Sequence, residues 1–190
     1  MQPIPLAGPA VEPITLPEAR AFLRLDGTEE DELLAALIAA ARLTVERATR
    51  RLLVAQSWRL ELDRWPPGRV VVLPLAPVLA IEAVRITDAA GAATTVDSAD
   101  LRLEPGDPAR LLVSAVLPEP GWPRGGVAID LLCGYGATAA SVPEPLRLAV
   151  RQLVAHWFER RGDEPGGDAG GLPAGIAALL APFRRPRLAP

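Results

Sequence analysis

The spacing of the hydrophobic residues changes twice along this chain, and this constrains the fold more than any other feature. Between residues 28 and 52, apolar side chains recur every three or four positions, which is the period of an amphipathic helix. Between residues 58 and 132 they form short alternating or β-branched runs separated by proline and glycine, which predicts strands. The helical period returns over residues 143–161. We therefore expect an α+β fold, in which helices from both ends form one core and an antiparallel β lobe is inserted between them.

The first 55 residues predict an arm followed by two helices. Residues 1–13 contain four prolines without periodicity and are expected to form an extended arm. Thr15 and Glu18 have the spacing of a capping box, which predicts a short helix ending near Leu25. A helix of about 20 residues is expected from Thr28. Its predicted apolar stripe consists of Leu34, Leu37, Ile38, Ala41, Val45, Ala48 and Leu52. Charged residues fall mostly off that stripe: Arg42, Glu46, Arg47, Arg50 and Arg51.

Residues 56–136 are expected to form an antiparallel sheet or a small sandwich. Trp58 to Asp63 alternate strictly between apolar and polar, as in a half-buried strand. Residues 88–91 are typical of a hairpin turn, and residues 94–96 are expected to form the strand that follows it. The many prolines of this region are suited to exposed strand edges, because proline donates no ladder hydrogen bond.

The C-terminal third predicts one long helix, a loop and a short helix. Ser141 and Glu144 suggest a second capping box, at the start of a helix over residues 143–161. The predicted organisation is an arm at 1–13, a helical pair at 14–55, a β lobe at 56–136, a long helix at 137–161 and a flexible loop, short helix and basic tail at 162–190.

Composition excludes several classes of function. The formal net charge of −3 and a pI near 5.3 argue against a protein that mainly coats nucleic acid. A single cysteine excludes an internal disulfide and a thiol-based metal site. The absence of a long apolar run and of a basic N-terminal start predicts neither a membrane span nor a signal peptide, so a soluble intracellular product is expected.

Candidate catalytic residues are few. His156 is the sole histidine and has no partner at metal-ligand spacing, and Cys133 would need a base brought close to act as a nucleophile. We interpret both as structural residues and predict no enzymatic activity, no metal and no cofactor. The acidic run of residues 29–32 is explained by the dipole at a helix start, without a bound cation.

Several segments, taken in order, resemble tailed-phage head–tail connector (adaptor) proteins. They are LPEARAFLRLD at 16–26, RLLVAQSW at 51–58, LLCGYG at 131–136, VPEPLRLAVRQLVAHWFERR at 142–161 and LPAGIAALLAPFR at 172–184. The resemblance extends from Ile14 to Arg184, and the order of the motifs is more specific than any one of them. It does not distinguish an infectious phage from a prophage or a phage-derived gene transfer agent.

The resemblance implies a structural role without catalysis. Such proteins form a ring, expected to be dodecameric, between the portal protein and the next ring or tail-completion (stopper) protein. The ring lies at the head–tail interface of a virion or phage-like particle assembled in the bacterial cytoplasm, and packaged DNA passes through it without specific readout. No membrane partner is implied. The family's C-terminal segment reaches towards the portal, so the expected portal-docking residues are Leu172, Ile176, Leu180, Phe183, Arg184, Arg185, Arg187 and Leu188.

A channel through which DNA slides should not grip phosphate tightly. We therefore expect acidic segments to face the channel or solvent: Glu29, Glu30, Asp31 and Glu32, or the loop at 162–170.

Two other functions compete with the adaptor. A sequence-nonspecific DNA-binding or DNA-packaging accessory protein would bind duplex DNA in a salt-dependent way through Arg184, Arg185 and Arg187. A small hydrolase or ligand-binding enzyme with a β lobe would need a convergent pocket of titratable groups. The net charge argues against the first, and the single histidine and cysteine argue against the second.

Overall fold

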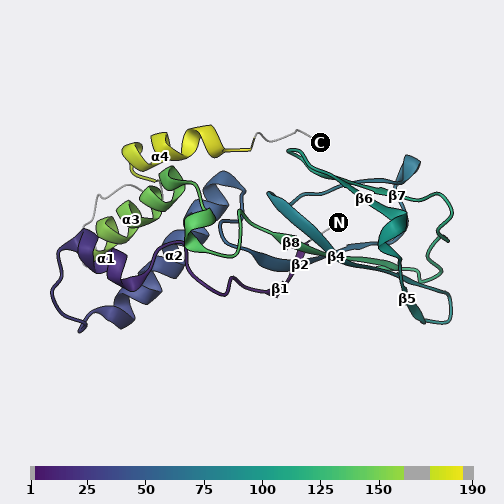
Figure 1. The fold of residues 1–190 in the computed structure, drawn as a ribbon, viewed down its shortest axis with the longest axis horizontal. Helices are drawn as coiled ribbons and strands as arrows, with labels where there is room; N and C mark the ends of the chain where they lie inside the picture. Colours follow the sequence, from purple (N-terminus) through teal and green to yellow (C-terminus); the bar gives the residue numbers. More distant parts are fainter. Residues whose placement is uncertain (1–2, 161–171, 186–190) are drawn as a thin grey trace. The chain divides into compact units, whose positions relative to one another are not determined.

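The computed structural model describes residues 3–160 and 172–185 (Figure 1). The contacts divide the chain into two compact units. The β unit comprises residues 1–10 and 55–135, and the helical unit comprises residues 11–54 and 136–190. The chain thus enters and leaves the β unit from the helical unit, and the predicted α+β class is confirmed.

The helical unit is built on α2, which packs against α3, while α3 also carries α1 and α4 (Figure 1). Its helices are α1 Leu16–Leu23, α2 Asp31–Thr49, α3 Glu144–Glu159 and α4 Ala174–Leu180, with single 3₁₀ turns at Ala139–Ser141 and Ala181–Phe183. The core is formed by the apolar faces of these helices. Its buried members include Leu34, Ile38, Ala41, Val45, Leu146, Ala149, Val150, Leu153, Val154, Ile176 and Leu180.

The start of α1 follows the sequence prediction. The Thr15 hydroxyl accepts from the Glu18 N–H, and the Glu18 carboxylate accepts from the Thr15 N–H, so the capping box is complete. The helix ends two residues before the predicted Leu25 because Arg24 adopts the left-handed conformation, with φ 57°. The next helix begins at Asp31 rather than at Thr28, since residues 29 and 30 form a turn.

The second predicted capping box is wrong. Helix α3 begins at Glu144 with Pro143 at its N-cap and no side-chain cap, and the Ser141 hydroxyl instead meets that of Thr138 at 3.0 Å. The reason is Pro143, which disfavours helical backbone at the residue before it and so delays the helix start.

The predicted stripe of α2 is only partly the buried face. Leu34, Ile38, Ala41 and Val45 are buried, but Leu37, Ala48 and Leu52 are half-buried. Two charged residues, Arg42 and Glu46, are buried with exposed fractions of 9% and 8%, although the pattern placed them off the stripe. They are buried as an ion pair, and the surroundings of this pair are described below.

The β unit holds two antiparallel sheets in its described residues (Figure 1). The five-stranded sheet has the order β1-β2-β8-β4-β5, and the three-stranded sheet has the order β3-β7-β6. The strands are β1 Pro3–Ala7, β2 Gln56–Leu62, β3 Val70–Val72, β4 Val78–Thr87, β5 Ala93–Thr95, β6 Leu101–Glu104, β7 Arg110–Val113 and β8 Val127–Cys133, with 3₁₀ turns at Pro67–Arg69 and Ser98–Asp100.

Within the predicted extended arm, residues 3–7 form the edge strand β1 on β2. Pro3 lies opposite Leu60 and Pro5 lies opposite Trp58. Proline is accommodated on an edge strand, where a missing N–H can face away from the ladder. The N-terminal segment is therefore part of the β unit.

The centre of the five-stranded sheet alternates as the pattern of Trp58–Asp63 predicts. Ile129 of β8 lies between Leu60 of β2 and Val84 of β4, and all three side chains are fully buried. The predicted hairpin at 88–91 is also present: it joins β4 to β5, and the Asp88 carboxylate accepts from the N–H groups of Ala90 and Ala92.

Among the described residues, no helix has both the length and the hydropathy that crossing a bilayer requires.

Two leucines on α2 test this description of the core. Leu34 is fully buried and Leu43 is 57% exposed. We expect Leu34→Ala to lower the free energy of unfolding by about 2–5 kcal/mol because it leaves a cavity. Leu43→Ala, the matched control, should cost less than about 1 kcal/mol in the isolated chain. Denaturant unfolding followed by helical circular dichroism measures both, and equal losses would contradict the assignment of the buried face.

Candidate assembly surfaces

The C-terminal segment, residues 172–185, is fastened to the helical unit by apolar and backbone contacts. Within α4, the side chains of Ile176 and Leu180 are buried. Beyond the helix, the Arg51 guanidinium donates to the Phe183 carbonyl at 2.8 Å, and the Arg185 N–H donates to the Thr49 carbonyl at 3.2 Å. The end of α2 therefore holds the last described residues of the chain.

These contacts sort the residues that sequence reasoning assigned to portal docking. Ile176 and Leu180 lie in the core of the helical unit and so anchor the segment. Leu172, Phe183 and Arg185 are half-buried, and Arg184 is exposed. Two further members of the predicted set, Arg187 and Leu188, lie outside the described residues.

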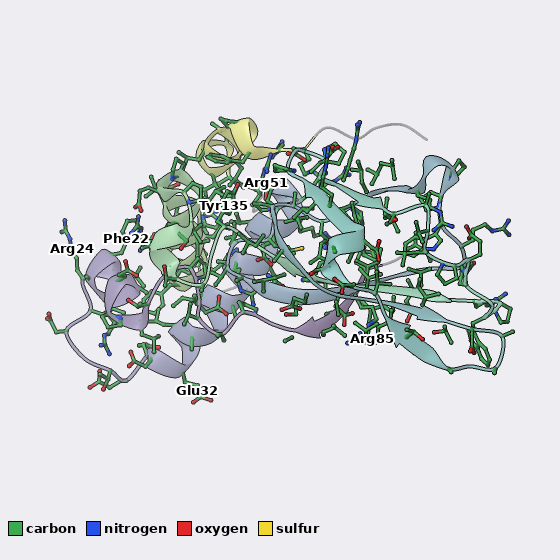
Figure 2. All side chains as sticks on the ribbon, turned by 45° about the vertical axis from the view of Figure 1, so that its right-hand side comes forward. Phe22, Arg24, Glu32, Arg51, Arg85 and Tyr135 are labelled. Atoms are coloured by element: carbon green, nitrogen blue, oxygen red, sulfur yellow. The ribbon has the colours of Figure 1, made fainter. Side chains whose placement is uncertain are left out.

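The acidic run before and within the first turn of α2 is also divided. Glu29 and Glu32 are exposed, and Figure 2 shows the Glu32 side chain pointing outward from the start of α2. Glu30 and Asp31 are half-buried, and Asp31 accepts two hydrogen bonds from Arg20 of α1, at 2.7 and 2.9 Å. Asp31 thus ties α1 to α2. The loop at 162–170, the other predicted channel-facing segment, lies outside the described residues.

Arg42 and Glu46 form a buried ionic centre on α2. Arg42 donates to Glu46 at 3.1 Å and to Glu12 at 2.8 Å, and Glu46 accepts from the Leu53 N–H at 2.9 Å. Burial opposes the charge of Arg42, but the bonds and attraction from the two carboxylates outweigh it and raise the pKa of the guanidinium. One helix face thereby fixes both residue 12 and residue 53.

Arg147 of α3 forms a second junction. It donates to the Pro13 carbonyl at 2.9 Å and forms ion pairs with Glu18 of α1 and Glu144 of its own helix. Burial alone would raise the pKa of Glu18, but hydrogen bonds from Thr15 and Arg147 lower it overall. The segment before α1 is thus held from α2 and from α3.

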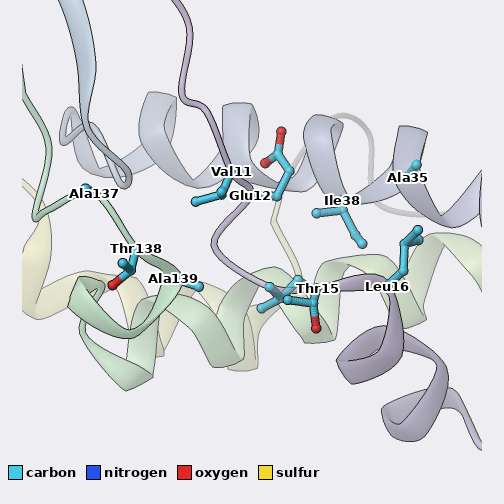
Figure 3. Close-up of a pocket in the computed structure, with 10 residues that line it drawn as sticks. Val11, Glu12, Thr15, Leu16, Ala35, Ile38, Ala137, Thr138 and Ala139 are labelled. Carbon is cyan, nitrogen blue, oxygen red and sulfur yellow. The ribbon is translucent and has the colours of Figure 1, made fainter.

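An apolar groove of about 470 Å³ opens between these junctions (Figure 3). Three stretches of chain line it: residues 11–16, the first half of α2, and residues 137–139. Its lining consists of Val11, Glu12, Ile14, Thr15, Leu16, Ala35, Ile38, Ala137, Thr138 and Ala139. Sequence reasoning missed this groove, because no local pattern shows that three separate stretches enclose one hollow.

The five-stranded sheet carries an ionic triad on the face opposite Leu60, Ile129 and Val84. Asp130 of β8 accepts from Arg59 of β2 at 2.6 and 2.9 Å and from Arg85 of β4 at 2.7 Å. The bond from Arg59 is the main cause that lowers the pKa of Asp130, and Arg85 adds to it against the opposing effect of burial. The triad joins the three central strands through their side chains.

Cys133 and His156, the two residues considered for catalysis, lie in different surroundings. Cys133 is fully buried, and burial together with the charge of Glu82 raises the pKa of its thiol to about 12, so the thiol is protonated at neutral pH. His156 is half-buried on α3. Within residues 3–160 and 172–185, no group of three histidine, cysteine or acidic side chains is placed to hold a metal ion.

Comparison with known proteins identifies the family. The family model described as "Phage gp6-like head-tail connector protein" matches residues 13–88. A chain in a structure titled "Neck of empty GTA particle computed with C6 symmetry" is 32% identical, with a TM-score of 0.82. A chain in "Virion of native gene transfer agent (GTA) particle" is 31% identical, with a TM-score of 0.80. A chain in "Neck of native GTA particle computed with C12 symmetry" is 33% identical, with a TM-score of 0.73.

Each alignment covers 100% of this chain and 98% of the other, so the likeness includes both units. The chain belongs to the phage gp6-like head–tail connector family. The resemblance found in the sequence is thereby confirmed, and this connector is a component of the head–tail interface of a phage-like particle. Among curated proteins, the search finds no match.

The fastening of the C-terminal segment to this connector can be tested at Arg51. Replacing Arg51 by Ala removes its bond to the Phe183 carbonyl. We expect faster amide hydrogen exchange in residues 174–185, with little change in the β unit, because the loss is local. Arg47→Ala is the matched control, since Arg47 is exposed in the last turn of α2. Equal protection in both variants would contradict the fastening role.

The ionic triad predicts a pH dependence of stability. The folded pKa of Asp130 is below its ordinary value, so its contribution is present above the unfolded pKa and is lost as the pH falls through the folded one. We expect Asp130→Asn to lower the free energy of unfolding by about 1–3 kcal/mol at neutral pH. The difference from wild type should shrink below about pH 4, the ordinary pKa of an aspartate.

Denaturant unfolding of the β unit across that pH range provides the measurement for Asp130→Asn. Glu61→Gln serves as control because Glu61 is exposed on β2 and acts on Arg59 only through its charge. A difference for Asp130→Asn that stays constant down to strong acid would refute the ionic contribution.

Proposed function

We propose that this connector is a structural adaptor that forms a homo-oligomeric ring between the portal and the tail of a phage-like particle and extends the DNA channel. The likeness to chains in particle necks, which extends over both units, is the main support for the proposal. Those necks were computed with sixfold and twelvefold symmetry. A closed ring of identical chains needs head-to-tail contacts that repeat at every subunit. We infer twelve copies and, as neighbours, the portal protein on one side and a tail-completion protein on the other.

In this proposal the connector works through assembly and not through catalysis. The thiol of Cys133 is buried and protonated, which supports a packing role for it. The exposed acidic residue Glu29 faces the channel or solvent, where negative charge would let DNA slide without binding. The net charge of −3 is consistent with a lumen that does not grip phosphate.

We further propose that the C-terminal segment docks on the portal. Within the described part of this segment, Ile176 and Leu180 anchor α4, and the bonds at Phe183 and Arg185 hold the residues after it on the end of α2. Portal contact then falls to Arg184 and to residues 186–190, which include Arg187 and Leu188. Arginine is suited to this role because its fork pairs with carboxylates on a partner.

A truncation placed after Arg185 tests portal docking without disturbing the anchors. We expect the truncated connector to fold with unchanged stability and to lose its place at the portal vertex, as seen by cryo-EM of particles made with the variant. A full-length chain with Arg184→Gln and Arg187→Gln separates the role of charge from that of the remaining tail. Wild-type particles should show a connector ring between portal and tail.

Three results would count against the adaptor role or the docking of its tail. A connector that is absent from the head–tail vertex of wild-type particles would refute the adaptor role itself. Tight binding of the isolated chain to duplex DNA, weakened by salt and by the two Arg→Gln changes, would favour the DNA-binding accessory instead. Normal portal association after truncation would refute only the docking role of the tail.

A further inference from the structure

Helix α1 ends in an exposed apolar knob next to a positive charge. Phe22 is 43% exposed, although an aromatic ring in the core of a domain would normally be buried. Arg24 is exposed two residues later and extends outward from the end of α1 in Figure 2. Its left-handed backbone, with φ 57°, turns the chain at this point and presents the guanidinium beyond the helix. Among the described residues Arg24 forms no ion pair.

A different part of the helical unit carries the complementary features. The groove between Val11, Leu16 and Ala35 is lined mainly by apolar side chains, and Val11 at its edge is 45% exposed. Glu32 lies one helical turn before Ala35 and is exposed beside the groove. In the described part of the chain it has no ionic partner. The one other carboxylate of the groove, Glu12, already binds Arg42.

The knob cannot fill the groove of its own chain. Phe22 is not among the residues that line the groove, and Figure 2 shows Arg24 and Glu32 pointing in different directions from separate elements. A volume of about 470 Å³ lies within the range of small-ligand pockets, which is enough for one phenyl ring. Phe22 can therefore enter such a groove only on another copy, where Arg24 and Glu32 would bring opposite charges together.

We propose that Phe22 of one copy inserts into the groove of the neighbouring copy, and that Arg24 pairs there with the neighbour's Glu32. The inference rests on the proposed ring function and names its subunit contact. The contact is heterologous, since each copy offers its knob to one neighbour and its groove to the other, as a closed ring requires. It has the anatomy of a stable interface, with an aromatic anchor in an apolar pocket and a charged pair at the rim.

Chemical cross-linking tests the pairing directly. In the double variant Arg24→Cys and Glu32→Cys, a short bifunctional thiol reagent should link neighbours, since an Arg–Glu pair holds the backbones farther apart than a disulfide allows. The native Cys133 does not interfere because it is buried and protonated. Particles made with this variant should give a ladder of covalent multimers in denaturing gels. Each single Cys variant should give none.

The outcomes separate the inference from the function on which it rests. A ladder that extends well beyond the dimer supports the contact. A connector ring that is present in the particle neck without a ladder overturns the contact and leaves the adaptor role intact. A ladder that stops at the dimer also overturns it, because it indicates a closed two-fold pair. Absence of the connector from wild-type necks overturns both.

A charge swap provides an independent measurement. Arg24→Glu places two carboxylates together at every interface, and Glu32→Arg places two guanidinium groups together. We expect each single reversal to reduce connector occupancy in particle necks about tenfold or more. The double variant restores opposite charges and should return occupancy to within about twofold of wild type. Arg124→Glu, at an exposed site in the β unit, is the matched control and should have little effect.

Failure of the double variant to recover, with each single variant folded as wild type, would contradict the pairing of Arg24 with Glu32. Phe22→Ala completes the test, because it removes the anchor without changing charge. It should reduce occupancy as strongly as a charge reversal while the isolated chain stays folded, since Phe22 is 43% exposed and lies outside the buried core.

Discussion

A buried ionic centre on α2 determines how the helical unit is arranged. Glu46 is nearly inaccessible, and a buried carboxylate is tolerated only when its charge is paired and its oxygens are hydrogen-bonded. Arg42 and the Leu53 N–H meet that need, and Arg42 in turn requires Glu12. The chain around residue 12 and the chain around residue 53 are thus both fixed to one face of α2. Turning α2 so that Arg42 and Glu46 faced solvent would break the bonds to Glu12 and to the Leu53 N–H.

The same constraint leaves the connector with surfaces for assembly. With one face of α2 committed to α3 and to the ionic centre, Leu33 and Leu43 on its far side are exposed, and the groove opens at the boundary between the two faces. A single chain gains nothing from such exposure, whereas a subunit of a particle neck can bury these side chains against a neighbour. The charged triad at Asp130 serves a different need, since it joins the central strands of the five-stranded sheet through their side chains.

Sequence reasoning succeeded where local chemistry decides the structure. The Thr15–Glu18 capping box, the alternation in β2 and the turn at 88–91 each depend on residues a few positions apart. It failed where distant residues decide. Residues 3–7 become a strand only because β2 offers an edge, and Arg42 is buried only because Glu12 meets it. At Ser141 the error was local, because the restriction that Pro143 places on the preceding residue outweighed the capping motif.

The candidate assembly surfaces were the least predictable part of the molecule for the same reason. Ile176 and Leu180 belong to an apolar run, and only tertiary contacts reveal that they anchor the C-terminal segment instead of projecting from it. The groove combines three stretches that share no motif, and Phe22 occupies a position that an amphipathic pattern assigns to the core. The proposed ring contact adds a further level, because it joins surfaces of different copies. What identifies it is the conjunction of an exposed aromatic, an unfilled apolar groove and two opposite charges without partners in the described chain.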